Sequence, residues 1–208
     1  MVSVRVWAPA GRRLPSWLMS GSEPPGPEDA HAPLRAALLR EPWIVIEVPE
    51  PIRSEVLAVR RIVSRVEART PVGIGSVGPL PPQNLDEVRR VLDQVADETA
   101  VIIGRFAAIR RFPQTRYVYL APDDEMATSL LILQDRLVEA GLRLLPDVYQ
   151  STPHAVIGRV PPEVELEVAA RARHLVPSPV FRMTTMALWM LGEGEASCLH
   201  RVAFTGVL

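Results

Sequence analysis

Short apolar runs rich in β-branched residues alternate with longer stretches of helical periodicity, and this alternation constrains the fold more than any other feature. Residues 43–48 read Trp-Ile-Val-Ile-Glu-Val, which is typical of a buried strand. After Pro51, apolar residues recur at helical spacing from Ile52 to Val66. Because segments of both kinds follow along the rest of the chain, the sequence predicts an α+β fold.

The order of these segments is nearly the same in the two halves of the chain. In the first half we expect strands at 43–48, 72–77 and 100–109, with a helix after each of the first two. Asn84 followed by Glu87 resembles a capping box and predicts the start of the second helix. In the second half, the expected strands are 116–120, 154–160 and 180–191, the expected helices are 124–140 and 163–175, and a last strand covers 199–207.

This repeat of β-α-β-α-β units predicts two similar lobes within one domain of residues 41–208. We expect lobes of approximately 43–111 and 114–208, with two mainly antiparallel sheets facing a central cleft and helices outside. A hairpin through Phe112 and Pro113 would join the two halves. Residues 1–40 are rich in proline and glycine and read as an N-terminal arm, with a short helix at 34–39.

Composition and charge narrow the class of protein. The formal net charge is −1, which disfavours non-specific nucleic-acid binding. Cys198 is the only cysteine, so an intramolecular disulfide is excluded and a cytoplasmic location is expected. All 23 basic residues are arginine, as in proteins from GC-rich bacterial genomes, and no signal peptide or membrane span is visible.

The segment 151–160, Ser-Thr-Pro-His-Ala-Val-Ile-Gly-Arg-Val, places a histidine at the start of the middle strand of the second half. Together with the element order, this Pro-His strand resembles the two-histidine (2H) phosphoesterases, which include the 2′-5′ RNA ligase-like proteins and cyclic phosphodiesterases. The resemblance covers residues 43–208. It implies that each lobe carries a His-x-Thr or His-x-Ser motif on a central strand, with one imidazole acting as base and the other as acid.

The chain departs from that pattern in both lobes. His154 matches the histidine of the second motif, but Val156 stands where the family has a hydroxyl residue. The matching first segment, residues 70–80, contains no histidine. Its register is open: counting back from the Gly-Pro turn places Gly73 and Gly75 at the motif positions, whereas aligning the two Thr-Pro pairs places residues 72 and 74 there.

We favour the glycine register because it turns the branched residues Val72 and Ile74 toward the helix-covered core. The cleft floor would then be Gly73, Gly75 and Val156, which is wider and more apolar than a phosphate cradle. Tyr117 and Tyr119 alternate with aliphatic residues and are expected to line the same cleft, since the resemblance implies an aromatic residue at position 119. His200 could substitute for the missing imidazole only if its strand borders the cleft.

Arg105, Arg110, Arg111 and Arg116 could form a patch for an anionic ligand, although a solvated hairpin accounts for them as well. No cofactor motif and no set of residues with metal-ligand spacing is present in the sequence. We therefore expect no metal and no cofactor.

Three hypotheses follow. The first is a degenerate 2H-phosphoesterase-fold protein that binds or transforms a small, partly apolar organic molecule, with His154 as the one retained acid or base, in specialised metabolism. The second is an active cyclic phosphodiesterase or RNA ligase-like enzyme acting on nucleotides or RNA ends, with a substitute for the missing histidine. The third is a non-catalytic interaction module that uses the N-terminal arm. The sequence leaves the oligomeric state open, and it does not decide whether the protein is an enzyme.

Overall fold

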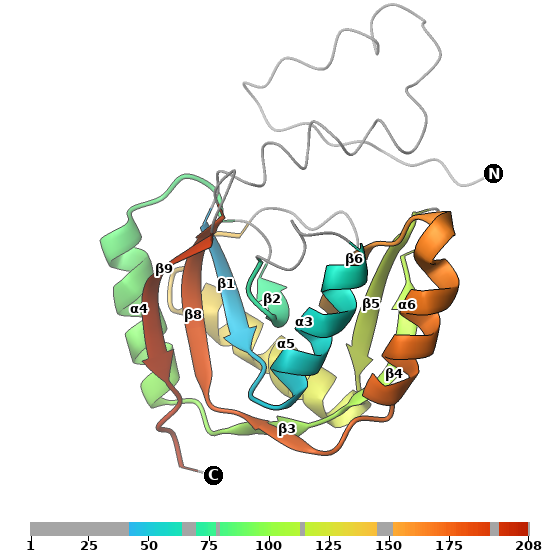
Figure 1. The fold of residues 1–208 in the computed structure, drawn as a ribbon. Coiled ribbons are helices and arrows are strands. Elements are labelled where there is room, and N and C mark those ends of the chain that lie inside the picture. The colour runs from blue at the N-terminus through green and yellow to red at the C-terminus, as the bar shows by residue number, and fades with distance from the viewer. Residues whose placement is uncertain are drawn as a thin grey trace, which may run out of the picture.

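The computed structural model describes residues 42–63, 70–77, 80–112, 115–144, 152–191 and 196–207 (Figure 1). Strands and α-helices alternate along these residues, and all paired strands are antiparallel. The predicted α+β class is therefore confirmed. The arm of residues 1–40 and its expected helix at 34–39 lie outside the described residues.

The larger sheet has four strands in the order β2-β1-β8-β9. It combines the first two strands of the described chain, β1 (Pro42–Glu47) and β2 (Gly73–Val77), with the last two, β8 (Thr185–Leu191) and β9 (Ala196–Ala203). Trp43 pairs with Trp189, and Ala187 pairs with both Val45 and Arg201. Because directly paired residues point to the same face of a sheet, these side chains share one face.

A second sheet has three strands in the order β4-β5-β6. The strands β4 (Phe106–Arg111) and β5 (Tyr117–Pro122) form the predicted hairpin through Phe112, and β6 (Ala155–Arg159) lies at the edge beside β5. The short strands β3 (Ile102–Gly104) and β7 (Phe181–Met183) pair separately.

Two helices pack on each larger sheet. The helix α4 (Leu85–Asp97) contacts β9 and β8, and α5 (Asp124–Glu139) contacts β2 and α4. On the other side of the molecule, α3 (Ile52–Val63) contacts β6 and α6 (Glu165–Ala172), which is flanked by the 3₁₀ turns η2 (Pro162–Val164) and η3 (Arg173–Leu175). Figure 1 shows α4 and α5 beside and behind the four-stranded sheet, with α3 and α6 in front of the three-stranded sheet.

Local sequence signals account for the helix starts and for the core. Asn84 caps α4 by accepting a hydrogen bond from the backbone N–H of Asp86, and Asp123 caps α5 by accepting one from Met126. On β1, Ile44 and Ile46 are fully buried in the core cluster that also contains the apolar residues of α4 and α5. The strand therefore buries alternate residues against the helices and presents residues 43, 45 and 47 on its other face.

The predicted lobe boundaries of 43–111 and 114–208 do not match the strand pairing. The C-terminal strands β8 and β9 join β1 in one sheet, whereas β4 pairs with β5 and β6. The sequence predicts one strand at 180–191, but the structure has two. The first, β7, pairs with β3, and the second, β8, pairs with β1. Strand partners of this kind are set by tertiary packing, which periodicity along the sequence does not report.

Candidate functional site

His154 lies immediately before β6 and is half-buried. Its Nδ1 is 2.6 Å from the backbone oxygen of Thr152. Because a carbonyl oxygen only accepts hydrogen bonds, Nδ1 carries the hydrogen, and the lone pair of the neutral ring lies on Nε2. His154 is therefore held in one tautomer, in which Nε2 can take up or release a proton.

Two aromatic rings hold the imidazole in place. The centroid of His154 lies 4.9 Å from that of Phe112 and 5.4 Å from that of Tyr119, and both contacts are edge-on. Phe112 and Tyr119 stack on one another at 4.4 Å. Tyr119 is only 7% exposed, so it supports His154 by packing. Tyr117 lies two residues earlier on β5 and is half-buried.

Val156 pairs directly with Tyr119 across β5 and β6, which places both on one face of the three-stranded sheet. The neighbouring residues Ala155 and Ile157 are fully buried on the opposite face. Val156 is half-buried and supplies a methyl surface at the position where the sequence resemblance implies a hydroxyl.

Arg60 of α3 connects the strand of the second motif with the segment that leads into β2. Its Nε and Nη2 donate to the backbone oxygen of Val156 at 2.9 and 2.6 Å. Its Nη1 donates to the backbone oxygens of Thr70 and Pro71 at 2.9 and 3.1 Å, and to the hydroxyl of Thr70 at 3.0 Å. The side chain is only 3% exposed, so this buried guanidinium ties together the two chain segments that carry the motif positions.

The burial of the first motif segment follows the pattern that the glycine register predicts. Ile74 is fully buried and Val72 is 4% exposed, both in the core, so Gly73 faces away from the core cluster. A Cβ on Gly73 would lie 2.1 Å from Cγ1 of Val45 and 2.5 Å from the backbone oxygen of Ile46. The expected widening of the cleft therefore does not occur at Gly73, because β1 already fills the space. Gly75 lies in β2, but its surroundings are outside the described part of the structure.

A profile of the 2′-5′ RNA ligase superfamily matches residues 68–195, which is more than half of the chain. The chain belongs to this superfamily. The matched residues include β2, β6 and His154. No curated protein matches the sequence.

Solved structures share the fold of this superfamily member. TT0787 of Thermus thermophilus is 16% identical, with 81% of this chain and 100% of that chain covered and a TM-score of 0.55. A structure described as a phosphoesterase is 16% identical, with 80% and 98% covered and a TM-score of 0.51. Escherichia coli LigT complexed with 3′-AMP is 16% identical, with 80% and 98% covered and a TM-score of 0.48. At this level of identity, the likeness to TT0787 and to the phosphoesterase establishes the fold alone.

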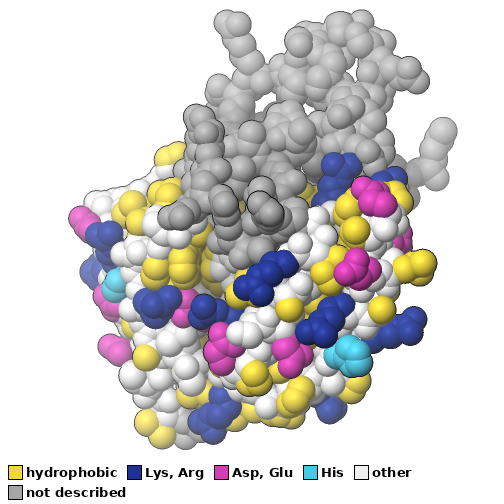
Figure 2. All heavy atoms as spheres, in the orientation of Figure 1, with side chains coloured by type: hydrophobic (Ala, Val, Ile, Leu, Met, Phe, Trp, Pro, Cys, Tyr) yellow, Lys and Arg dark blue, Asp and Glu magenta, His cyan; other side chains and the backbone are white. Residues whose placement is uncertain are grey.

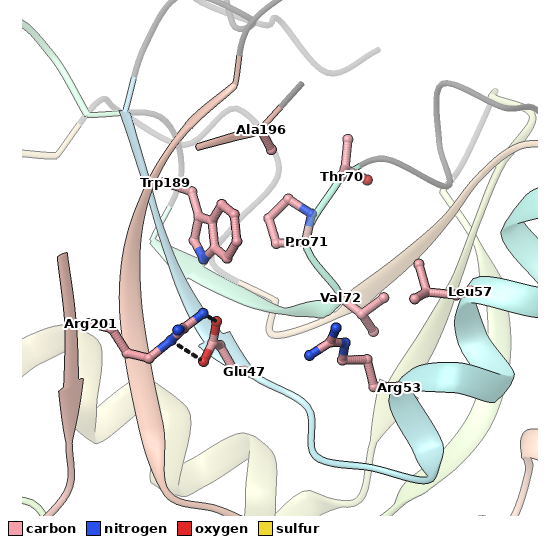
Figure 3. Close-up of a pocket in the computed structure, with 9 residues that line it drawn as sticks. All are labelled: Glu47, Arg53, Leu57, Thr70, Pro71, Val72, Trp189, Ala196 and Arg201. Carbon is pink, nitrogen blue, oxygen red and sulfur yellow. Dashed lines mark hydrogen bonds and ion pairs between the residues drawn. The ribbon is translucent and has the colours of Figure 1, made fainter. Parts of the chain in front are cut away.

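A pocket of about 280 Å³ opens on the face of the four-stranded sheet that Val45 and Glu47 share (Figure 3). Its lining comes from three strands of that sheet, from α3, and from the segment before β2: Glu47, Arg53, Leu57, Thr70, Pro71, Val72, Trp189, Ala196 and Arg201. None of the sequence-predicted site residues lines it. No local sequence signal marks it, because its lining residues come together only when β1, β8 and β9 pair.

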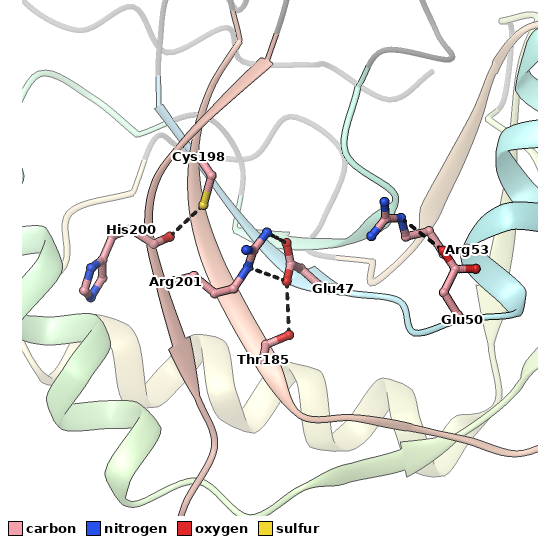
Figure 4. Close-up of polar contacts among 7 residues, drawn as sticks. All are labelled: Glu47, Glu50, Arg53, Thr185, Cys198, His200 and Arg201. Atoms are coloured by element: carbon pink, nitrogen blue, oxygen red, sulfur yellow. Dashed lines mark hydrogen bonds and ion pairs between the residues drawn. The ribbon is translucent and has the colours of Figure 1, made fainter.

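Arg201 and Glu47 form the main ion pair in this pocket (Figure 4). Nε and Nη2 of Arg201 donate to the two carboxylate oxygens of Glu47 at 2.9 and 2.8 Å, and Thr185 donates to the same carboxylate at 3.2 Å. The hydrogen bonds to Glu47 and its negative charge raise the pKa of Arg201 above its ordinary value. The guanidinium also lies 5.9 Å from the ring centroid of Trp189.

The other candidates from the sequence are engaged elsewhere. His200 Nε2 lies 2.6 Å from Oδ1 of Asp93 on α4. In the predicted arginine patch, Arg111 pairs with Glu165, and Arg105 lies 3.7 Å from Asp123. Among the described residues, no three His, Cys, Asp or Glu side chains are grouped as metal ligands, and no helix is long and apolar enough to cross a membrane.

Proposed function

We propose that this member of the 2′-5′ RNA ligase superfamily does not act as a two-histidine phosphodiesterase. Instead, it binds or transforms a small, partly apolar organic molecule beside His154, which is the one acid or base of its motif pair. A fold does not determine the activity of the site that it carries. A changed site on this fold is therefore consistent with a protein that has been recruited to specialised metabolism.

The crowding at Gly73 carries this proposal. In the glycine register, residue 73 holds the place of the first histidine, and a Cβ there would overlap Val45 and the backbone of β1. The alternative register assigns that place to Val72, which is buried in the core. Neither arrangement supplies a second imidazole. Removal of one of two proton-transfer groups typically lowers a rate by about 10²- to 10⁴-fold.

His154 retains what one-histidine chemistry needs. The hydrogen bond from Nδ1 to Thr152 fixes the tautomer, and the edges of Phe112 and Tyr119 fix the plane of the ring. Around it, Val156 and the aromatic rings provide an apolar surface. This combination supports recognition of a molecule with one hydrogen-bonding group and an apolar body.

His200 is a poor substitute for the missing imidazole. It lies on β9, which is three strand positions away from β2 in the four-stranded sheet. At about 4.8 Å per strand, this separation is roughly 14 Å. Its Nε2 is also held by Asp93. The near-neutral net charge of the chain adds no attraction for RNA ends.

A crystal structure of the protein as purified, together with mass spectrometry of the molecules released on denaturation, tests this proposal. We expect density for an organic molecule without phosphate within about 3.2 Å of Nε2 of His154. The same preparation of His154→Phe should release much less of that molecule. A site filled by the protein's own side chains, with nothing released from the wild-type protein, would contradict the proposal.

A further inference from the structure

We propose that the molecule bound beside His154 is a hydroxy or amino carboxylate, and that Arg110 is the residue that selects its acidic group. This inference rests on the function proposed above and names the class of ligand for the same site. The carboxylate would lie at the guanidinium of Arg110, and an O–H or N–H group would lie at Nε2 of His154. The apolar body between them would lie against Tyr119 and Val156.

Arg110 lies on the face of the three-stranded sheet that supports His154. It pairs directly with Tyr119, which in turn pairs with Val156, so the three side chains form one row across β4, β5 and β6. The ring of His154 is 5.4 Å from that of Tyr119, the middle member of this row. At about 4.8 Å per strand, the two ends of the row are about 10 Å apart, a gap that the arginine side chain and one ring of a ligand fill together.

The arginines of the predicted patch differ in what they contact. Arg111 points to the opposite face of the sheet and pairs with Glu165 of α6, and Arg105 lies 3.7 Å from Asp123. Arg110 is exposed and makes no hydrogen bond or ion pair with any described residue. Its guanidinium is therefore reachable from solvent and has its donors available to a ligand.

The charges on this sheet favour an anion. The strands β4, β5 and β6 contain three arginines and no aspartate or glutamate. Two of these arginines lie on the face of Tyr119: Arg110, and Arg159, which pairs with Tyr117. By contrast, arginine and carboxylate side chains lie beside one another on the side of the molecule that carries α3 and α6 (Figure 2). A guanidinium binds a carboxylate through two parallel hydrogen bonds, which makes a carboxylate the matching group.

The tautomer of His154 defines the second polar group of the ligand. Because Nδ1 donates to the backbone oxygen of Thr152, Nε2 of the neutral ring accepts a hydrogen bond. A carboxylate also only accepts, so it does not pair with Nε2, and Arg110 is its partner instead. The group at Nε2 must carry a hydrogen, as a hydroxyl or an amine does. The two ends of the site therefore recognise two different groups of one molecule.

Titration of the full-length protein with 4-hydroxyphenylacetate tests this inference. The chain has four histidines, and His154→Phe identifies the imidazole signals that belong to His154 in ¹H–¹⁵N spectra. We expect 4-hydroxyphenylacetate to bind saturably and to shift those signals. The neutral 4-hydroxyphenylacetamide should bind about tenfold more weakly, because it lacks the charge that pairs with Arg110.

Two neighbouring arginines provide the variant and its matched control. Arg110→Gln should weaken binding of 4-hydroxyphenylacetate by about tenfold and leave binding of the amide unchanged, whereas Arg111→Gln, on the opposite face of the same strand, should bind both as the wild type does. Equal binding of acid and amide, unchanged binding of the acid by Arg110→Gln, or no saturable binding of the acid would each overturn the inference.

The molecule released from the purified protein separates this inference from the proposed function. A released organic molecule that carries a carboxylate supports both. A released molecule without a carboxylate would overturn the role of Arg110 and leave the proposed function standing, and a protein that releases nothing would contradict both.

Discussion

Replacement of Arg60 by methionine should destabilise the protein strongly, because this side chain joins α3, β6 and the segment before β2. The substitution removes hydrogen bonds to the backbone oxygens of Val156, Thr70 and Pro71. An acceptor left without a partner costs about 1–3 kcal/mol, and the low end applies here because water can reach part of the site. Three such oxygens give a loss of about 3 kcal/mol in the free energy of unfolding, which for a domain of this size is roughly 6–12 °C in Tm.

Urea unfolding of Arg60→Met, Arg60→Lys and Arg61→Met measures this contribution. Lysine keeps the charge but cannot place donors on both segments at once. The free energy of unfolding of Arg60→Lys should therefore lie between those of Arg60→Met and the wild type. Arg61 is exposed next to Arg60, and its substitution should change stability by less than about 0.5 kcal/mol. Because Val156 lies two residues after His154, the imidazole signals of His154 should shift in Arg60→Met. A decrease of less than about 1 kcal/mol in the free energy of unfolding of Arg60→Met would contradict this prediction.

Three further predictions concern local contacts. Gly73→Ala should lower the free energy of unfolding by about 1–3 kcal/mol or more in urea titrations, because its Cβ would overlap Val45. Asn84→Ala should lower it by about 1 kcal/mol through loss of the helix cap. The hydrogen bond with Ser54 lowers the pKa of Glu50 in the folded state, so its contribution is present above the ordinary value of 4.5 and is lost as the pH falls below it. The difference in stability between wild type and Glu50→Gln should accordingly shrink as the pH is lowered below 4.5, and a difference that stays constant there would contradict this assignment.

Much of the secondary structure follows from local rules, but the arrangement of the strands does not. The helix caps at Asn84 and Asp123 and the hairpin between β4 and β5 depend on neighbouring residues, so sequence patterns report them. The pairing of β8 with β1 joins residues more than 130 positions apart. Such a long-range pairing depends on tertiary packing, which local patterns do not report, and for this reason the predicted lobe boundaries do not match the sheets.

Residues of the candidate site could be proposed from the sequence only where they lie on the same strand. The Pro-His strand predicts His154 and Val156 as site residues, and the preference of branched side chains for the core predicts the observed burial of Val72 and Ile74. The crowding at Gly73 could not be predicted from the sequence, because it depends on where β1 lies. Arg60 was missed, although it lies four residues after Val56 on the buried face of α3, where a charged residue signals a specific partner. Trp189 and Arg201 were missed because they meet only when β8 and β9 pair.

Turnover of 2′,3′-cyclic AMP, measured from pH 5 to pH 9 for the wild type and for His154→Ala, tests the central claim that the motif pair retains one acid or base. We predict that both proteins release nucleotide monophosphate at the rate of the buffer alone, or that any slow reaction lies at least about 10²-fold below that of a two-histidine superfamily enzyme assayed in parallel. Turnover as fast as that enzyme's, with a bell-shaped pH profile and abolished in His154→Ala, would contradict the account.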